Sequence, residues 1–310
     1  MRVAVTGGAG FIGSHVVDQL LEAGHDVVVV DMLPPHRDVE ARAVDVLDLD
    51  GLQQATADCD AVFHLAAVSN VKDVERDPAR AVAVNVVGTT NVWEAARRNE
   101  LRRAVLASTV WVYGAAVGQR GLDERTPMVV DSIGHTYTAT KLAAEMVVHS
   151  MHDLYGQPFT ILRYGIPYGP RMRSDLVIAR FVDNALAGRP ITIEGSGLQY
   201  RNYVYVEDLA RAHVLALSDA GENEVFNLEG PEPVSVRRIA EAVQLALDHR
   251  VRIVHGPARA GDFTGREVSA ERARTRLGWE PRVGFEDGLR RYIEWLVDET
   301  GEAAASTMNG

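Results

Sequence analysis

The sequence predicts an α/β protein whose first half forms a doubly wound parallel sheet. Short apolar runs alternate there with helical patterns, which is typical of this architecture. Near-continuous apolar runs such as 27–30 indicate strands that helices cover on both faces. The expected strands are 2–6, 26–31, 41–45, 60–65, 103–108 and 159–163, and the expected helices are 11–23, 49–57, 79–99 and 135–155. Ligands of such sheets bind beyond the carboxyl ends of the strands, so the residues after each strand are the site candidates.

A glycine-rich turn follows the first strand and opens the first helix. Glycine lets backbone N–H groups approach a ligand, and the positive end of a helix favours a pyrophosphate. Asp31 ends the second strand, where it would accept hydrogen bonds from an adenosine ribose and repel a 2′-phosphate. This context predicts a site for NAD rather than NADP. Its expected cofactor-binding residues are Gly7, Gly10, Phe11, Ile12, Gly13 and Asp31.

Further cofactor contacts are expected after the third and fourth strands. Asp45 and Val46 would meet the adenine edge, although aspartate is also common after strands for turn formation. The fourth strand ends at Leu65 and is followed by the small residues Ala66 and Ala67, and all three are expected where a cofactor passes close to the sheet edge. His64, on the same apolar strand, is interpreted as a hydrogen-bonded core histidine rather than an acid or base.

Composition narrows the class of protein. A net charge of −11 argues against a nucleic-acid-binding surface, and 46% hydrophobic residues in 310 support a large core in two lobes. The single cysteine, Cys59, excludes an intrachain disulfide and is consistent with a reducing compartment. No apolar run approaches 18 residues, and the chain starts directly with a strand, so we expect a cytoplasmic protein with no membrane partner.

A second informative stretch carries hydroxyls and a Tyr/Lys pair. Tyr137 and Lys141 share one helix face because they are four residues apart. An ammonium beside a phenol favours phenolate and would lower the tyrosine pKa from about 10 toward neutrality. Tyr137 would then be a general base for a sugar hydroxyl while hydride leaves the carbon. Thr109, at the end of a strand, could share that substrate oxygen, and Ser108 is the alternative hydroxyl.

With these residues in place, the chain resembles the extended short-chain dehydrogenase/reductase family, specifically its NAD-dependent nucleotide-sugar epimerases and dehydratases of the UDP-glucose 4-epimerase type. The resemblance covers nearly the whole chain. It is carried by the 6–13 fingerprint, Thr109 four residues before Tyr113-Gly114, the Tyr137/Lys141 pair, and the segments 85–89, 162–164, 201–208, 259–262 and 277–281.

The resemblance implies a Rossmann-type sheet with a smaller α+β substrate-binding lobe. The cofactor part would span 1–165 with a returning segment of about 200–227, and the substrate lobe would comprise 166–199 and 228–295. The helices near 79–99 and 136–153 resemble the family's dimer-forming pair, so a homodimer is expected. The segment 302–310 is expected to be a frayed tail.

The resemblance also assigns roles to individual residues. Tyr137 would be the base, Lys141 would bridge the nicotinamide ribose, and Thr109 would orient the sugar C4 hydroxyl. Further cofactor contacts would come from Asn85, on the nicotinamide side, and from Ser108 and Tyr164. Contacts to a nucleotide-diphosphate sugar would come from Ser69, Arg201, Arg259 and Asp262, with the two arginines clamping the diphosphate unless they only form surface salt bridges.

Two departures from the family pattern bear on the reaction. Relatives that dehydrate or decarboxylate place a carboxylate one or two positions after the catalytic Thr, where this chain has Val110 and Trp111. A hydrophobic pair cannot move the extra proton, which favours 4-epimerisation over decarboxylation or 4,6-dehydration. A 4-ketoreductase stays an alternative, and it would differ by consuming NADH. The family's Arg-Tyr-Phe-Asn appears here as 163–166 with Gly and Ile at its end, so one polar substrate contact is missing.

Arg266 bears on the substrate. It lies four residues after Asp262, where many hexose epimerases carry a tyrosine and uronate-processing relatives carry an arginine. A guanidinium there would pair with a C6 carboxylate unless it points to solvent, so UDP-hexoses and UDP-hexuronates are both expected substrates. His135 has two interpretations, as a solvated helix-start residue or as an additional acid. A dinucleotide-sensing regulatory protein is the non-catalytic alternative, which the complete Thr109/Tyr137/Lys141 set disfavours.

Overall fold

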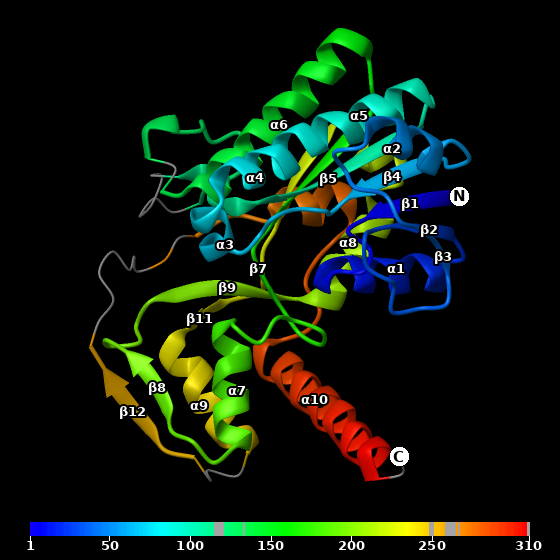
Figure 1. Ribbon diagram of the computed structural model, residues 1–310. Helices are drawn as coiled ribbons and strands as arrows, with labels where there is room; N and C mark the ends of the chain where they lie inside the picture. The colour runs from blue at the N-terminus through cyan, green and yellow to red at the C-terminus, as the bar shows by residue number, and fades with distance from the viewer. Residues whose placement is uncertain (115–120, 133, 248–250, 258–264, 266, 309–310) are drawn as a thin grey trace.

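The protein is built around a seven-stranded parallel sheet with the strand order β10-β6-β5-β4-β1-β2-β3 (Figure 1). The computed structural model describes residues 1–308 except 115–120, 133, 248–250, 258–264 and 266. The strands of this sheet are β1 (Arg2–Thr6), β2 (Asp26–Val30), β3 (Glu40–Arg42), β4 (Ala61–His64), β5 (Arg103–Thr109), β6 (Phe159–Tyr164) and β10 (Glu224–Leu228). The predicted doubly wound parallel sheet is confirmed, and β1 pairs with both β2 and β4, so the strand order reverses there.

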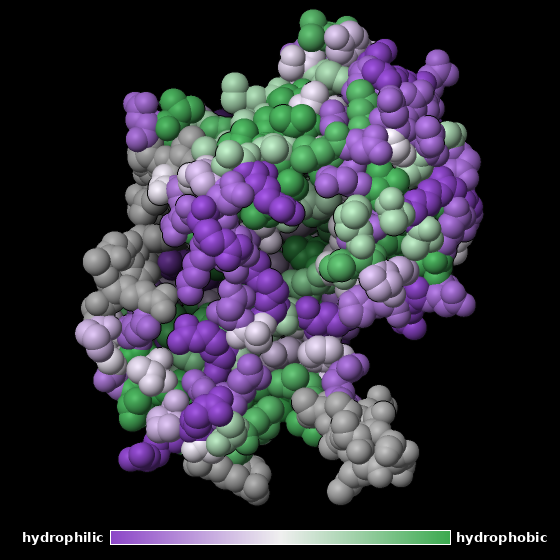
Figure 2. All heavy atoms as spheres, in the orientation of Figure 1, coloured by the Kyte–Doolittle hydropathy of each residue, from purple (hydrophilic) through white to green (hydrophobic). Residues whose placement is uncertain are grey.

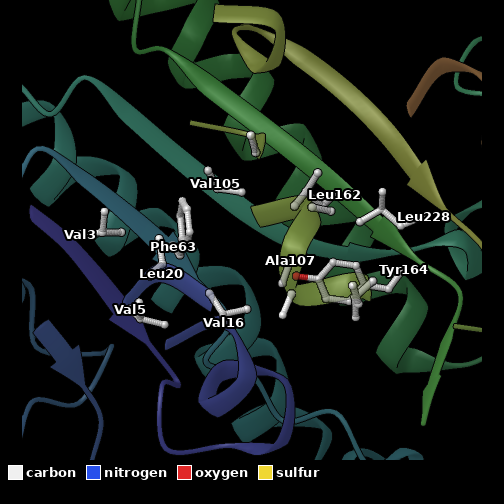
Figure 3. Packing of buried hydrophobic residues seen from close by; sticks show 14 of the residues in the cluster. Val3, Val5, Val16, Leu20, Phe63, Val105, Ala107, Leu162, Tyr164 and Leu228 are labelled. Carbon is white, nitrogen blue, oxygen red and sulfur yellow. The ribbon is translucent and has the colours of Figure 1, made fainter. Parts of the chain in front are cut away.

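Helices cover both faces of this sheet. One face carries α1 (Phe11–Glu22) and α8 (Val206–Leu215), whose apolar residues join the core cluster shown in Figure 3. The opposite face carries α2 (Leu49–Thr56), α5 (Gly88–Arg98) and α6 (Thr136–Tyr155) over a second cluster. Because the strands are buried on both sides, their near-continuous valine runs are explained.

The helix expected at 79–99 is a composite. It comprises α4 (Pro78–Val82), a π-helical turn η1 (Ala83–Val87) and α5, with α3 (Val71–Arg76) preceding it as a short helix that the sequence analysis did not predict. The third strand is shorter than expected, since β3 spans three residues. Short 3-10 segments η2 (Val110–Tyr113), η3 (Val130–Ser132) and η4 (Asp219–Gly221) and a π turn η5 (Ala273–Leu277) complete the irregular helices.

A smaller lobe lies below the sheet in Figure 1. It contains a three-stranded sheet of order β11-β9-β7 and a two-stranded sheet of β12 and β8. Its elements are β7 (Ile166–Tyr168), α7 (Val177–Leu186), β8 (Ile191–Glu194), β9 (Tyr200–Tyr205), β11 (Pro233–Ser235), α9 (Val236–Ala246), β12 (Ile253–Gly256) and α10 (Phe285–Met308). They enclose a core cluster of their own around Tyr168, Ile239 and Phe285.

The chain passes between the two lobes several times. After β7 and α7 it builds β8 and β9 in the smaller lobe, then returns through α8 to add β10 to the seven-stranded sheet. The C-terminal helix α10 extends to Met308 and so includes most of the segment expected as a tail, whose fraying stays a prediction. Among the described residues, no helix combines the length and the apolarity that crossing a membrane requires.

Candidate active site

A cavity of about 1160 Å³ lies at the carboxyl edge of the large sheet, where the smaller lobe faces it. Figure 2 shows the hollow between the two lobes. Residues from both lobes line it, from the glycine turn after β1 to Arg201 and Tyr203 of β9. The cavity therefore occupies the position that parallel sheets use for ligands.

The glycine turn forms one end of this cavity. Gly7 has a φ of +71°, and a Cβ placed on it would lie 2.5 Å from the backbone nitrogen of Ala66. Gly10 precedes α1 as its N-cap and carries no side-chain cap, so the positive end of the helix faces the cavity wall. A cradle that a side chain would fill, at a helix N-terminus, fits the pyrophosphate of a dinucleotide. Five predicted turn residues line the cavity: Gly7, Gly10, Phe11, Ile12 and Gly13.

Asp31 is held at the cavity by the backbone. Its Oδ2 accepts from the amide of Ala9 at 3.0 Å and its Oδ1 from the amide of Leu33 at 3.0 Å. Each carboxylate oxygen retains a further lone pair, so Asp31 can still accept from a ribose hydroxyl. The other residues predicted at the adenine end and along the small-residue wall also line the cavity: Asp45, Val46, Leu65, Ala66 and Ala67.

Thr109, Tyr137 and Lys141 line the same cavity, from the carboxyl end of β5 and the first turns of α6. Lys141 is buried, and its Nζ donates to the carbonyl oxygen of Ala107 at 2.9 Å. Thr109 Oγ1 accepts from the amide of Trp111 at 3.2 Å, which fixes the hydroxyl while leaving its proton to donate. A hydroxyl, a phenol and an ammonium group thus line one cavity where the sheet ends.

The pKa of Tyr137 differs from the sequence-based expectation. Burial raises it to about 12, and Arg173 opposes this rise through its positive charge. Burial also lowers the pKa of Lys141 to about 8. The sequence predicted that the Lys141 ammonium group would lower the pKa of Tyr137. In the protein without cofactor, the loss of hydration on burial raises this pKa instead. The ammonium group donates to the Ala107 carbonyl oxygen.

The Ser108 hydroxyl is engaged by another side chain of the protein. Its side chain is buried and donates to Oε1 of Glu145, a residue of α6 that the sequence analysis did not select. Thr109 also lines the cavity, and its role as the hydroxyl for substrate stays a prediction. Tyr164, the other expected cofactor neighbour in this region, lines the cavity beside Ser108, and its OH hydrogen-bonds to the ring of His213 at 2.6 Å.

Asn85 lies behind the cavity wall. It is 2% exposed, its Oδ1 accepts from the amide of Val68 at 2.8 Å, and its Nδ2 donates to the Val68 carbonyl and to Thr140 Oγ1, both at 3.0 Å. Asn85 therefore holds the backbone of Val68, which is part of the cavity wall.

His64 is a hydrogen-bonded core histidine as predicted. Thr6 Oγ1 lies at 2.8 Å and Thr89 Oγ1 at 3.0 Å from its two ring nitrogens.

His135 is the N-cap of α6. Its Nδ1 accepts from the amide of Thr138 at 3.2 Å, and its ring packs against Trp111 at 4.7 Å between centroids. Neither the solvated nor the acidic interpretation anticipated this cap. Because Trp111 lines the cavity, His135 supports an aromatic part of the wall.

The residues expected at the substrate divide into two groups. Ser69 and Arg201 line the cavity. Arg259, Asp262 and Arg266 lie outside the described residues. Sequence reasoning missed Arg173, which lines the cavity, is paired with Asp175 at 3.1 Å and lies close enough to influence Tyr137. It sits in the irregular segment between β7 and α7, where no motif or periodicity marks it.

Comparisons with known proteins agree with this geometry. The sequence profile of the NAD dependent epimerase/dehydratase family matches residues 3–228. The UDP-glucose 4-epimerase of Mycolicibacterium smegmatis is 35% identical over 318 residues, covering 97% of this chain and 100% of the relative.

Solved structures resemble the whole fold. The UDP-glucose 4-epimerase of Thermotoga maritima with UDP-glucose superposes with a TM-score of 0.89 at 32% identity, covering 97% of this chain and 100% of the other. The UDP-glucuronic acid 4-epimerase of Bacillus cereus, in complex with UDP-glucuronic acid and NAD, gives 0.87 at 29% identity, covering 96% and 100%. With its glycine turn, its Tyr/Lys pair and a match over most of its length, this chain belongs to the NAD dependent epimerase/dehydratase family.

Proposed function

We propose that this protein is an NAD-dependent 4-epimerase of nucleotide sugars, acting on a UDP-hexose or UDP-hexuronate through a transient 4-keto sugar. One observation carries the proposal: Thr109, Tyr137 and Lys141 line the same cavity as the glycine turn and Asp31. A cofactor held at the turn would extend along the small-residue wall toward the Tyr/Lys pair. Relatives named for UDP-glucose and UDP-glucuronate 4-epimerisation support both sugar classes.

Three side chains of the protein have separate roles in the proposed reaction. NAD, when bound, supplies a hydride acceptor and a cationic ring. As a phenolate, which the positive charges of Lys141 and of bound NAD would favour, Tyr137 would take the proton of the sugar C4 hydroxyl as the carbon is oxidised. Thr109 would orient that oxygen. Lys141 provides a positive charge on the same helix face as Tyr137. After the 4-keto sugar has rotated in the cavity, Tyr137 would return the proton to the sugar oxygen when the carbon is reduced on its other face.

The residues after Thr109 favour epimerisation over decarboxylation or dehydration. Val110 is 4% exposed, and Trp111 packs against the His135 ring and presents an apolar wall to the cavity. Neither side chain can carry a proton. A carboxylate at this position is what the resemblance associates with the other two reactions.

Incubation with a panel of UDP-, dTDP- and GDP-sugars tests this function. NMR of the products separates a C4 epimer from loss of carbon dioxide or water, and a 4-ketoreductase would consume added NADH stoichiometrically. We expect a C4 epimer of at least one UDP-sugar without net NADH consumption. A product of changed mass, or no turnover with any of these sugars, would contradict the proposal.

The substrate contacts are part of the same proposal. We infer that the smaller lobe is the substrate lobe. It comprises the predicted segments 166–199 and 228–295 together with β9, which the sequence had placed with the cofactor part. Arg201 and Arg259 are proposed to bind the diphosphate, and Asp262 to accept from the nucleotide ribose. Arg266 is proposed to pair with a C6 carboxylate. If so, Arg266→Ala lowers kcat/KM for UDP-glucuronate more than for UDP-glucose, and an equal loss for both sugars contradicts that role.

We also propose a cytoplasmic homodimer. Exposed apolar side chains lie on η1 and α6, where Val87 is 48% and Met146 64% exposed. An uncovered apolar face of this kind favours association, and the single cysteine suits a reducing compartment. Met146→Glu should convert a dimer to a monomer in sedimentation experiments, and a wild-type monomer at micromolar concentration would contradict the assembly.

A further inference from the structure

Two successive turns of α6 hold two successive residues of β5. Lys141 Nζ donates to the Ala107 carbonyl oxygen at 2.9 Å. Glu145, four residues later on the same helix face, accepts from the Ser108 hydroxyl. The next residue of β5 is Thr109, so the position of its hydroxyl depends on both attachments.

Glu145 also holds the neighbouring strand. Arg163 of β6 donates to it through Nη2 to Oε2 at 2.7 Å and through Nε to Oε1 at 3.1 Å. Ser108 and Arg163 are register partners between β5 and β6, so one carboxylate bridges the two strands. Arg163 in turn donates from Nη1 to the Tyr113 OH at 2.9 Å.

This ion pair lies in the interior. The side chains of Arg163 and Glu145 are 5% and 3% exposed. Removing two charges from water costs several kcal/mol per ion and often cancels the attraction between them, so a buried pair is weak evidence for a purely stabilising role. Its position, one turn beyond Lys141, points to a role in the site.

We propose that Glu145 is a positioning residue of this active site, which fixes the carboxyl ends of β5 and β6 against α6 and places a negative charge beside the Lys141 ammonium group. The catalytic consequence rests on the proposed function. The attachment of the two strands and the effect of the Glu145 charge on Lys141 do not depend on the proposed function, and they are tested separately.

Glu145 affects the pKa of Lys141 through its charge. Tyr137 and Glu145 lie on the same face of α6 as Lys141. His64 of β4 is close enough for its charge to interact with that of Lys141, whereas Arg163 of β6 pairs with Glu145. Burial lowers the pKa of Lys141 to about 8, and Glu145 opposes this. Burial also lowers the pKa of His64 to about 3, so that ring is neutral at pH 7. Without the Glu145 carboxylate, this charge would no longer oppose the effect of burial on the Lys141 pKa.

The composition of the chain provides a direct measurement. It contains two lysines, Lys72 and Lys141, so protein labelled with ¹³C at lysine Cε gives one buried and one exposed signal. We expect the Lys141 signal of the wild type to titrate near pH 8 and that of Glu145→Gln to titrate lower by about one unit or more, as loss of a neighbouring opposite charge predicts.

Two further variants separate charge from packing. Glu145→Asp keeps the charge and should hold the Lys141 pKa within about 0.3 units of wild type even if the shorter side chain weakens the ion pair. Glu222→Gln is the matched control, because Glu222 accepts from the buried Arg103 at 2.9 Å away from the cavity. It should leave the Lys141 titration unchanged.

If Glu145→Gln does not fold, Glu145→Gln/Arg163→Met removes both charges and should place the Lys141 pKa between those expected for wild type and for Glu145→Gln. An unchanged Lys141 titration in either charge-removing variant overturns the proposal.

With a sugar that the wild type epimerises, the alkaline limb of the pH profile of kcat for Glu145→Gln should move to lower pH together with the Lys141 pKa. A uniform fall of kcat at every pH, with no shift of the alkaline limb, would mean that the Glu145 charge does not act on Lys141 and overturns the electrostatic part of the proposal. Absence of any epimer in the wild type would instead refute the proposed function.

Discussion

A Cβ atom placed on Gly13 would lie 2.0 Å from the carbonyl oxygen of Gly7, so the start of α1 and the end of β1 touch across the glycine turn. No rotamer relieves that contact, because both atoms belong to or adjoin the backbone. The turn can change only if α1 moves away from the sheet.

Gly13→Ala should therefore disrupt the cofactor site. Overpacking of a closed site costs about 1–3 kcal/mol, so we expect a lower free energy of unfolding and loss of NAD binding, measured by urea denaturation and calorimetry. Gly284→Ala is the control, since a Cβ at Gly284 meets nothing within 4 Å. Wild-type NAD affinity in Gly13→Ala would show that the turn is more adaptable than its contacts indicate.

Tyr137→Phe should stop the reaction without affecting the fold. It removes the phenol that exchanges a proton with the sugar, and loss of a general base typically lowers kcat by about 10²–10⁴-fold. Tyr155→Phe, at a 57% exposed position near the end of α6, should retain full turnover. Steady-state rates measure the loss of turnover, and an unchanged NAD affinity shows that the folded cofactor site is retained. A Tyr137→Phe variant with more than a tenth of wild-type kcat would exclude Tyr137 as the base.

Asp31→Asn should weaken the preference for NAD over NADP. The amide can still accept from one backbone N–H but no longer repels a 2′-phosphate, so the ratio of the two dissociation constants should narrow about tenfold, equivalent to about 1.4 kcal/mol. Calorimetric titration with each dinucleotide measures it. Asp50→Asn, on an 88% exposed side chain of α2, serves as the control and should leave the ratio unaltered.

Stability should fall below pH 6.5 because of buried histidines. Burial lowers the pKa of His64 to about 3 and that of His213 to about 4 from an ordinary 6.5. As pH falls through 6.5, the unfolded chain binds protons that the folded rings exclude. The free energy of unfolding should then decrease by up to about 1.4 kcal/mol per pH unit for each ring, and it should show no such loss above pH 6.5.

Urea denaturation at pH 7.5, 6.5 and 5.5 measures this dependence. His213→Gln removes one titrating group, so its loss of stability between pH 6.5 and 5.5 should be smaller than that of the wild type. An identical slope in the two proteins would show that His213 does not contribute.

The parallel sheet was predictable because its signals are local. Each strand of the first half is a short apolar run, and residues 7–13 and 31 have a spacing that a βαβ unit requires. The same applies to Tyr137 and Lys141, which a single helix face brings together. Local patterns also predicted that His64 packs in the core.

The missed features depend on contacts between distant segments. Glu145 reads in the sequence as one more residue of a long helix, and its meaning comes from Ser108 and Arg163 on two strands. Its spacing of four from Lys141 was the available signal. Asn85 was assigned to the cavity, but the fold places Val68 between them, and the pKa of Tyr137 was misjudged because burial depends on the assembled site.

The late return of β10 has a consequence for synthesis of the chain. Until residue 228 has left the ribosome, β6 is an edge strand with an open row of backbone hydrogen-bonding groups. The nascent chain must build part of the smaller lobe while this edge awaits its partner, a period in which pairing with another chain competes. A fragment ending near residue 165 would carry the glycine turn and the Tyr/Lys pair and still lack the strand that closes the sheet.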